Sequence, residues 1–175
     1  MRYATLNDDD DPFHINWDGF DFADLDWRMD VTVMPMLERA KARKQKLEIN
    51  LTYVAFTRQS GSAPYLHLDP EEYAEFILAA YLHLRDKYGV VPDDLEVLLE
   101  PDNAKNHTPV TLGRAMAAVS KRLRHAGFAP RLIAPSTANA ALALQWLDGI
   151  ASVPGATDDL AELSYHRYKG AKPPV

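Results

Sequence analysis

The chain has 175 residues, of which 47% are hydrophobic and 25% charged, and this composition is typical of one globular domain. The formal charge of −6 argues against a protein that binds nucleic acid by neutralising phosphates, because such binding needs a basic face. The absence of cysteine excludes disulfide bonds, thiolate zinc sites and a cysteine nucleophile. We find neither a membrane span nor a signal peptide in the sequence, so we expect a soluble protein whose compartment the sequence leaves undecided.

The first quarter of the chain shows few regular patterns. Residues 2–6 suit a short strand, which an acidic loop follows at positions 7–11. Residues 13–27 are aromatic and acidic without a period, which indicates an ordered surface segment. Apolar residues at helical spacing then predict a helix over 30–44, in which Pro35 either begins or breaks the helix.

Strand patterns and helix patterns alternate from residue 47 onward. We expect strands over 47–56, 95–99, 131–134 and 162–168, and helices that begin at Pro70, Pro109 and Thr137. The first two helices have clear start signals, because Asp69 and Thr108 are good N-caps and a proline follows each of them. Gly89 marks the end of the first helix.

The alternating order predicts an α/β protein with a parallel sheet of five strands, counting residues 2–6 as the first. Two architectures fit this order: a doubly wound open sheet and part of an eight-stranded barrel. The glycine-rich phosphate-binding fingerprints of many doubly wound nucleotide-binding proteins are missing from the sequence. Their absence makes the barrel the favoured architecture.

Glu100 is the main candidate for a catalytic group. In parallel α/β folds the functional side chains lie at the C-terminal ends of the strands. Glu100 is a lone carboxylate that directly follows an apolar strand, and Pro101 comes after it. A carboxyl group in this position is expected to be desolvated, which raises its pKa and suits it to donate a proton near neutral pH.

The segment Leu99-Glu100-Pro101-Asp102-Asn103 resembles the Asn-Glu-Pro signature on the fourth barrel strand of clan A retaining glycoside hydrolases. Residues 131–136 are similar to the fifth strand of that family, and residues 163–168 are similar to its sixth. Glucosylceramidase-like members are the closest match. The resemblance extends over nearly the whole chain, roughly from the second barrel strand to the sixth.

The resemblance implies that residues 1–175 form one partial domain, an incomplete (β/α)8 TIM barrel with about five of the eight strands. It also implies a retaining glycosidase mechanism that acts on O-glycosidic bonds, expected to be β-linked, with Glu100 as the acid/base. The family's nucleophile is a glutamate on the seventh strand, which this sequence does not reach, so we assign it to no residue. We therefore expect the chain to be an internal piece of a larger enzyme and inactive by itself.

Six further residues are candidates for binding a carbohydrate or glycoside: Asp8, Asp102, Asn103, Tyr165, His166 and Tyr168. Asp8 follows the first strand, two lie beside Glu100, and three belong to the last strand. We expect His166 to face one side of that strand and the two tyrosines the other. No cofactor and no metal is expected, and the open sheet edges and apolar inner face of an unclosed barrel favour self-association.

Two other functions stay open. The first is a non-catalytic remnant of the same fold that binds a carbohydrate or a partner, favoured by the missing nucleophile and by Leu99, which stands where the signature has Asn. The second is an unrelated doubly wound enzyme whose aspartates at positions 8–11 bind a metal ion. That architecture requires the first strand to lie inside the sheet, with both faces of the sheet covered.

Overall fold

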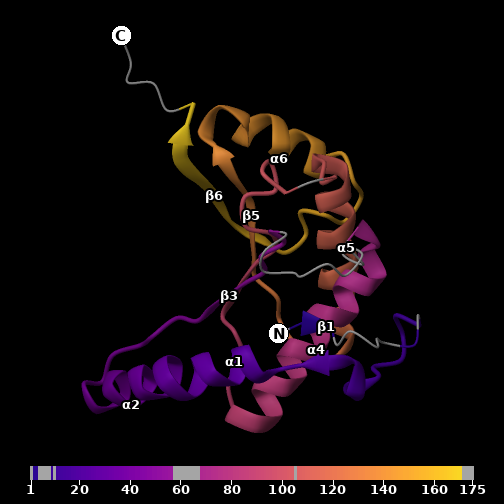
Figure 1. Ribbon diagram of the computed structural model, residues 1–175. Coiled ribbons are helices and arrows are strands. Elements are labelled where there is room, and N and C mark those ends of the chain that lie inside the picture. Colours follow the sequence, from indigo (N-terminus) through magenta and orange to yellow (C-terminus); the bar gives the residue numbers. More distant parts are fainter. Residues whose placement is uncertain (1, 4–8, 10, 57–67, 105, 171–175) are drawn as a thin grey trace.

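The computed structural model describes residues 2–3, 9, 11–56, 68–104 and 106–170 (Figure 1). Its main body is a parallel sheet of four strands: β3 (Asn50–Thr52), β4 (Asp94–Glu96), β5 (Leu132–Asn139) and β6 (Leu160–Lys169). The strands lie side by side in the order in which they occur along the chain. The predicted α/β class and the parallel sheet are therefore confirmed.

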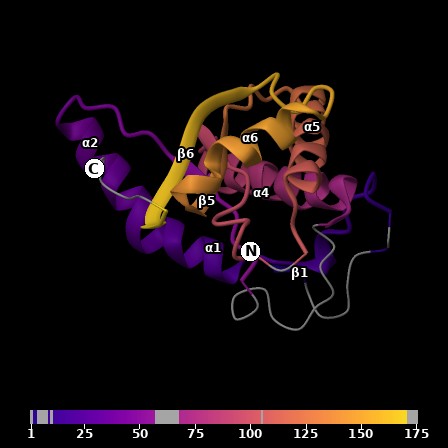
Figure 2. The same ribbon diagram turned by 90° about the horizontal axis from the view of Figure 1, so that it is seen from above.

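Three helices connect the strands of this sheet: α4 (Pro70–Tyr88), α5 (Pro109–His125) and α6 (Ala143–Ala151). All three lie on the same side of the sheet (Figures 1 and 2). Right-handed crossovers between strands in sequential order produce this one-sided arrangement, whereas a doubly wound sheet reverses its strand order at one point. The described strands contain no such reversal, so the doubly wound alternative is not supported.

The start signals read from the sequence form the predicted helix caps. The Oδ1 atom of Asp69 accepts hydrogen bonds from the backbone N–H groups of Glu71 and Glu72, at 2.8 and 3.2 Å. Gly89 ends α4 with a φ of 66°, in the left-handed region that favours glycine. Thr108 begins α5 by accepting a hydrogen bond from the backbone N–H of Thr111 at 3.1 Å.

The predicted start of the third helix at Thr137 is wrong, because β5 extends to Asn139 before the chain turns. The carboxylate of Asp102 accepts hydrogen bonds from the backbone N–H groups of Ala138 and Asn139, at 2.7 and 3.0 Å, and so holds this segment extended. Asn139 then caps a short 3-10 turn, η4 (Ala140–Leu142), which precedes α6. The helix therefore begins six residues later than predicted.

The first predicted strand does not belong to the parallel sheet. Strand β1 (Arg2–Tyr3) pairs antiparallel with β2 (Phe20–Asp21) and forms a separate two-stranded ribbon. Phe20 is buried, and its ring centroid lies 6.4 Å from that of Phe76 on α4, so the ribbon is packed against this helix. The parallel sheet therefore has four strands in the described residues, and not the five that we predicted.

An N-terminal helical arm follows the ribbon (Figure 1). A 3-10 turn, η1 (Trp17–Gly19), comes before β2, and after it α1 (Ala23–Arg28), a π-helical turn (Met29–Val33) and α2 (Met34–Ala42) follow one another without a break. Pro35 lies in the first turn of α2, where proline is tolerated, so it does not interrupt the arm. The Asp26 carboxylate joins α1 to α4 by accepting hydrogen bonds from His83 Nε2 at 2.6 Å and Lys87 Nζ at 2.9 Å.

The main hydrophobic core lies between the parallel sheet and the three helices. Several side chains in it are completely inaccessible to solvent: Leu95, Val97, Met116, Val119, Leu123, Leu132 and Ile150. The buried Tyr73 of α4 donates a hydrogen bond from its hydroxyl to the backbone oxygen of Val97 at 2.7 Å. In the described part of the chain, no helix combines the length and the apolar character needed to cross a lipid bilayer.

Candidate functional site

Glu100 lies in a tight turn just beyond the C-terminal end of β4. Its φ of 49° is in the left-handed region, which residues other than glycine rarely adopt. Its backbone N–H donates to the carbonyl oxygen of Ser136 on β5 at 3.0 Å, and its own carbonyl accepts from the N–H of Asn103 at 2.9 Å. The backbone on both sides of Glu100 is therefore fixed, and its side chain has a defined origin.

The carboxylate of Glu100 contacts the last strand of the sheet. Its Oε1 atom lies 2.7 Å from Nδ1 of His166 on β6, and its Oε2 atom accepts a hydrogen bond from Nδ2 of Asn103 at 3.1 Å. Strand β5 lies between β4 and β6, so this contact joins the ends of two strands that are not neighbours. The side chains of Glu100 and His166 are 14% and 30% exposed, which leaves the pair accessible to a ligand.

The pKa of Glu100 differs in direction from our prediction. Burial raises it, but the hydrogen bonds from His166 and Asn103, together with the positive charge of Lys169, outweigh burial and hold the pKa below the usual range of a glutamate. The predicted upward shift is therefore wrong for the protein without ligand. Because Glu100 is ionised near neutral pH, it accepts the hydrogen bond and Nδ1 of His166 donates it.

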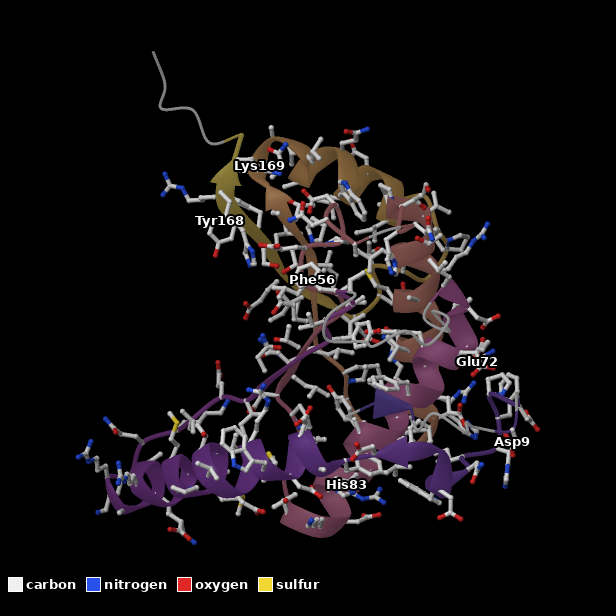
Figure 3. All side chains as sticks on the ribbon, viewed as in Figure 1. Asp9, Phe56, Glu72, His83, Tyr168 and Lys169 are labelled. Atoms are coloured by element: carbon white, nitrogen blue, oxygen red, sulfur yellow. The ribbon has the colours of Figure 1, made fainter. Side chains whose placement is uncertain are left out.

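Tyr168 lies on the same face of β6 as His166. The two ring centroids are 5.5 Å apart with nearly perpendicular planes, and the Tyr168 side chain is exposed (Figure 3). Tyr165 instead lines a hollow between β6 and α6, together with Leu144 and Leu147. The prediction that the two tyrosines share a face is wrong, since side chains of a strand alternate and residues 165 and 168 are three positions apart.

The remaining predicted site residues have different positions. Asn103 contacts the Glu100 carboxylate, as described above. Both carboxylate oxygens of Asp102 accept backbone hydrogen bonds from β5, so Asp102 fixes the loop that carries Glu100. Asp8 lies outside the described residues. The structure therefore brings together Glu100, Asn103, His166 and Tyr168 and places Tyr165 on the other face of the sheet.

A second carboxylate, Glu96, is the last residue of β4, the strand that precedes the turn of Glu100. From the sequence we assign it no function. Its Oε2 atom accepts a hydrogen bond from the Thr52 hydroxyl at 2.9 Å, and its Oε1 atom accepts one from the Ser136 hydroxyl. Thr52 and Glu96 alternate with Leu51 and Leu95, which contribute to the core. Strand alternation therefore places them on the face opposite the helices, a signal that was available in the sequence.

We use the term polar face for Thr52, Glu96, Ser136, Glu100 and His166 together. They come from all four strands or their C-terminal ends and are connected by hydrogen bonds. An apolar surface was predicted on this side of an unclosed barrel. At these positions the prediction is wrong, because the side chains are polar and have partners within the sheet.

The described residues do not form a metal site. Among them, no group of three or more histidine, aspartate and glutamate side chains is arranged to hold a metal ion. Two aspartates of the acidic loop are described, and both make local contacts. The Oδ1 atom of Asp11 accepts from the backbone N–H of Phe13 at 3.0 Å. The carboxylate of Asp9, which is labelled in Figure 3, contacts His14.

Comparisons with protein-family models, with curated proteins and with solved structures find no match for this chain. The sequence resemblance and the geometry of the polar face are therefore the basis on which a function can be inferred. Both depend on the same residues, since the carboxylate of the glutamate-proline segment is the one that contacts β6.

Proposed function

We propose that this chain is part of a (β/α)8-type barrel that binds a carbohydrate on the polar face, with Glu100 as the acid/base for cleavage of a β-linked O-glycosidic bond. The observation that carries the proposal is the 2.7 Å contact between Glu100 Oε1 and His166 Nδ1. It joins the two segments that resemble the fourth and sixth strands of retaining glycoside hydrolases, at the edge of the sheet where parallel α/β enzymes have their active sites.

The strand order supports the barrel part of this proposal. Four parallel strands in sequential order, with every connecting helix on one side, form the repeating unit from which such a barrel is built. The face opposite the helices corresponds to the inside of the barrel. In that setting Glu100, His166 and Tyr168 surround the position where a sugar enters.

The chemistry assigned to Glu100 has two halves. In a retaining mechanism the acid/base protonates the departing glycosidic oxygen and later removes a proton from water. The ionised carboxylate is ready for the second half. For the first half, a bound sugar that displaces water from Glu100 raises its pKa by desolvation, and the N–H of His166 keeps the carboxyl group oriented toward the bond.

The contacts to the sugar are assigned to the groups beside the carboxylate. Asn103 and His166 hold polar atoms at the edge of the sheet, and the exposed ring of Tyr168 provides an apolar surface against which the C–H groups of a sugar pack. The resemblance places the nucleophile on the seventh barrel strand, so we assign it to no described residue and expect binding without turnover.

A non-catalytic carbohydrate-binding function is the second candidate. It is favoured by the lowered pKa of Glu100, because a carboxylate that stays ionised binds sugar hydroxyl groups well but protonates a leaving group poorly. Under this alternative Glu100 is a ligand-binding residue, and the neighbouring contacts keep the roles described above.

The experiment that separates the two functions supplies the missing nucleophile from solution. An aryl β-glycoside is incubated with the protein, with and without added azide, and release of the aryl alcohol is followed. For an enzyme, azide attacks the anomeric carbon while Glu100 protonates the leaving oxygen, so release depends on azide and is lost in Glu100→Gln. The matched control is Glu162→Gln, an exposed glutamate near the start of β6.

The outcomes of this experiment are distinct. Release that depends on both azide and Glu100 supports the glycosidase proposal. Glycoside binding without release, followed from the imidazole resonances of His166, supports the binding function instead. If neither release nor binding is detected with any aryl β-glycoside, both candidate functions are wrong.

A further inference from the structure

Ser136 occupies an unusual position beside Glu100. It is fully buried at the C-terminal half of β5, and its φ of 58° is in the left-handed region. Non-glycine residues in this region are uncommon and persist only where their surroundings hold them, which is often at functional sites. The Ser136 carbonyl accepts the hydrogen bond from Glu100 N–H at 3.0 Å, and Glu100 is itself in the left-handed region.

The hydroxyl of Ser136 is also held by a hydrogen bond, in this case to a side chain of β4. It donates to Glu96 Oε1, and the other oxygen of this carboxylate accepts from the Thr52 hydroxyl at 2.9 Å. The backbone N–H of Glu96 donates to Asn50 Oδ1 at 3.1 Å, which fixes this residue against β3. A continuous series of hydrogen bonds therefore extends from β3 through Glu96 and Ser136 to the backbone of Glu100.

We propose that Ser136, locked in its left-handed conformation by Glu96, is the positioning residue for Glu100. The hydroxyl fixes the direction of the Ser136 carbonyl, and this carbonyl fixes the backbone from which the Glu100 side chain reaches His166. Ser136 does not touch a ligand in this scheme. This inference rests on Glu100 being the functional carboxylate proposed above.

The inference can be tested without any ligand by following the carboxyl carbon of Glu100 in a pH titration by NMR. In the wild-type protein the Glu100 contact with His166 keeps the titration midpoint below the ordinary glutamate range. Ser136→Ala removes the hydroxyl, so the turn loosens and the midpoint moves upward toward the ordinary value. Glu96→Gln leaves the side chain in place but weakens its acceptor, and the same direction of shift is expected.

A matched control separates a positioning role from a general effect of the substitution. Ser120 on α5 is also buried, and its hydroxyl has no hydrogen-bond partner in the described structure. Ser120→Ala is therefore expected to leave the Glu100 midpoint and the His166 resonances unchanged. A folded Ser136→Ala protein whose Glu100 midpoint equals that of the wild type would show the inference to be wrong.

A milder variant keeps the test decisive if Ser136→Ala fails to fold. Thr52→Val removes one of the two hydrogen bonds to Glu96 and preserves the shape of the side chain. It is expected to shift the Glu100 midpoint in the same direction by a smaller amount, and an unchanged midpoint contradicts the inference.

If the azide-dependent reaction is observed, the rate in Ser136→Ala is expected to fall by at least about tenfold, because misplaced catalytic groups lose rate steeply.

The titration midpoint of Glu100 tests the positioning role, and glycoside binding or release tests the proposed function, so the failure of one can be told from the failure of the other. A shifted midpoint without glycoside binding or release supports the positioning role and contradicts the proposed function. An unchanged midpoint together with Glu100-dependent release leaves the proposed function standing and removes Ser136 from it.

Discussion

The two faces of the parallel sheet are built from different kinds of contact. On the side of the helices, residues such as Leu95, Leu132 and Met116 are completely buried and packed against one another. On the opposite side, Thr52 and Glu96 hydrogen-bond to their neighbours and stay partly accessible. Packing dominates the first face and directional hydrogen bonds dominate the second.

The two kinds of contact differ in what they contribute to the folded chain. Burying apolar side chains contributes roughly 25 cal/mol per Å² removed from water, which makes the helix side the main source of folding free energy. Hydrogen bonds contribute a small net free energy, but they fix direction. The polar face is therefore suited to orienting a carboxylate, and the helix side supplies the rigid support for it.

The largest expected effect is on the helix side. Leu95→Ala leaves a cavity at a fully buried position of β4 and is expected to lower the free energy of unfolding by about 2–5 kcal/mol. Urea unfolding followed by circular dichroism measures this loss. Thr52→Val, on the neighbouring strand but on the polar face, serves as the comparison and is expected to cost about 1 kcal/mol. Equal losses for the two variants would contradict the difference between the faces.

The parts of the fold that local chemistry controls could be predicted from the sequence. Asp69, Gly89 and Thr108 act within a few residues of their own positions, and the helix ends that they mark are confirmed. The start of α6 could not be predicted in this way. It depends on the carboxylate of Asp102, which binds backbone N–H groups 36 and 37 residues further along the chain.

The candidate site shows the same limit. Its location at the C-terminal end of β4 follows from the sequence, because Glu100 directly follows an apolar strand. The direction of its pKa shift does not, since it depends on His166, which is 66 residues away in the sequence. The roles of Glu96 and Ser136 could not be predicted either, because they depend on hydrogen bonds between strands. The wrong prediction for Tyr168 has a different cause, because strand alternation puts residues 166 and 168 on one face and this neighbourhood could have been predicted from the sequence.

An effect of intermediate size is expected from Glu100→Gln, and it depends on pH. The folded-state pKa of Glu100 lies below its unfolded value of about 4.3, so its contribution to stability is complete above that pH and is lost as pH falls through the folded value. At pH 7 the variant is expected to be less stable by about 1 kcal/mol, which allows for partial exposure of the pair. Below the folded pKa the difference from the wild type should vanish.

Urea unfolding at pH 7 and at successively lower pH values measures this pH dependence. The control is again Glu162→Gln, whose carboxylate is exposed and lies 3.6 Å from Arg131. A stability difference for Glu100→Gln that persists unchanged at acid pH would show that the loss comes from packing and not from the ionised carboxylate. The hydrogen-bonded character of the polar face would then be in doubt.

The smallest effect on stability, and the sharpest separation of stability from binding, is expected from Tyr168→Ala. The side chain is 79% exposed and its ring contacts the imidazole of His166 edge-on. Surface positions of this kind change the free energy of unfolding by less than about 0.5 kcal/mol when substituted. Binding of an aryl β-glycoside, measured by titration against the His166 resonances, is nevertheless expected to weaken by about tenfold, because the proposed stacking surface is lost. Tyr165→Ala supplies the matched comparison, since it removes the same side chain from the face that carries the helices and should leave binding unchanged. If Tyr165→Ala weakens binding and Tyr168→Ala does not, the ligand lies on the helix side of the sheet, and the proposal that it binds on the polar face is wrong.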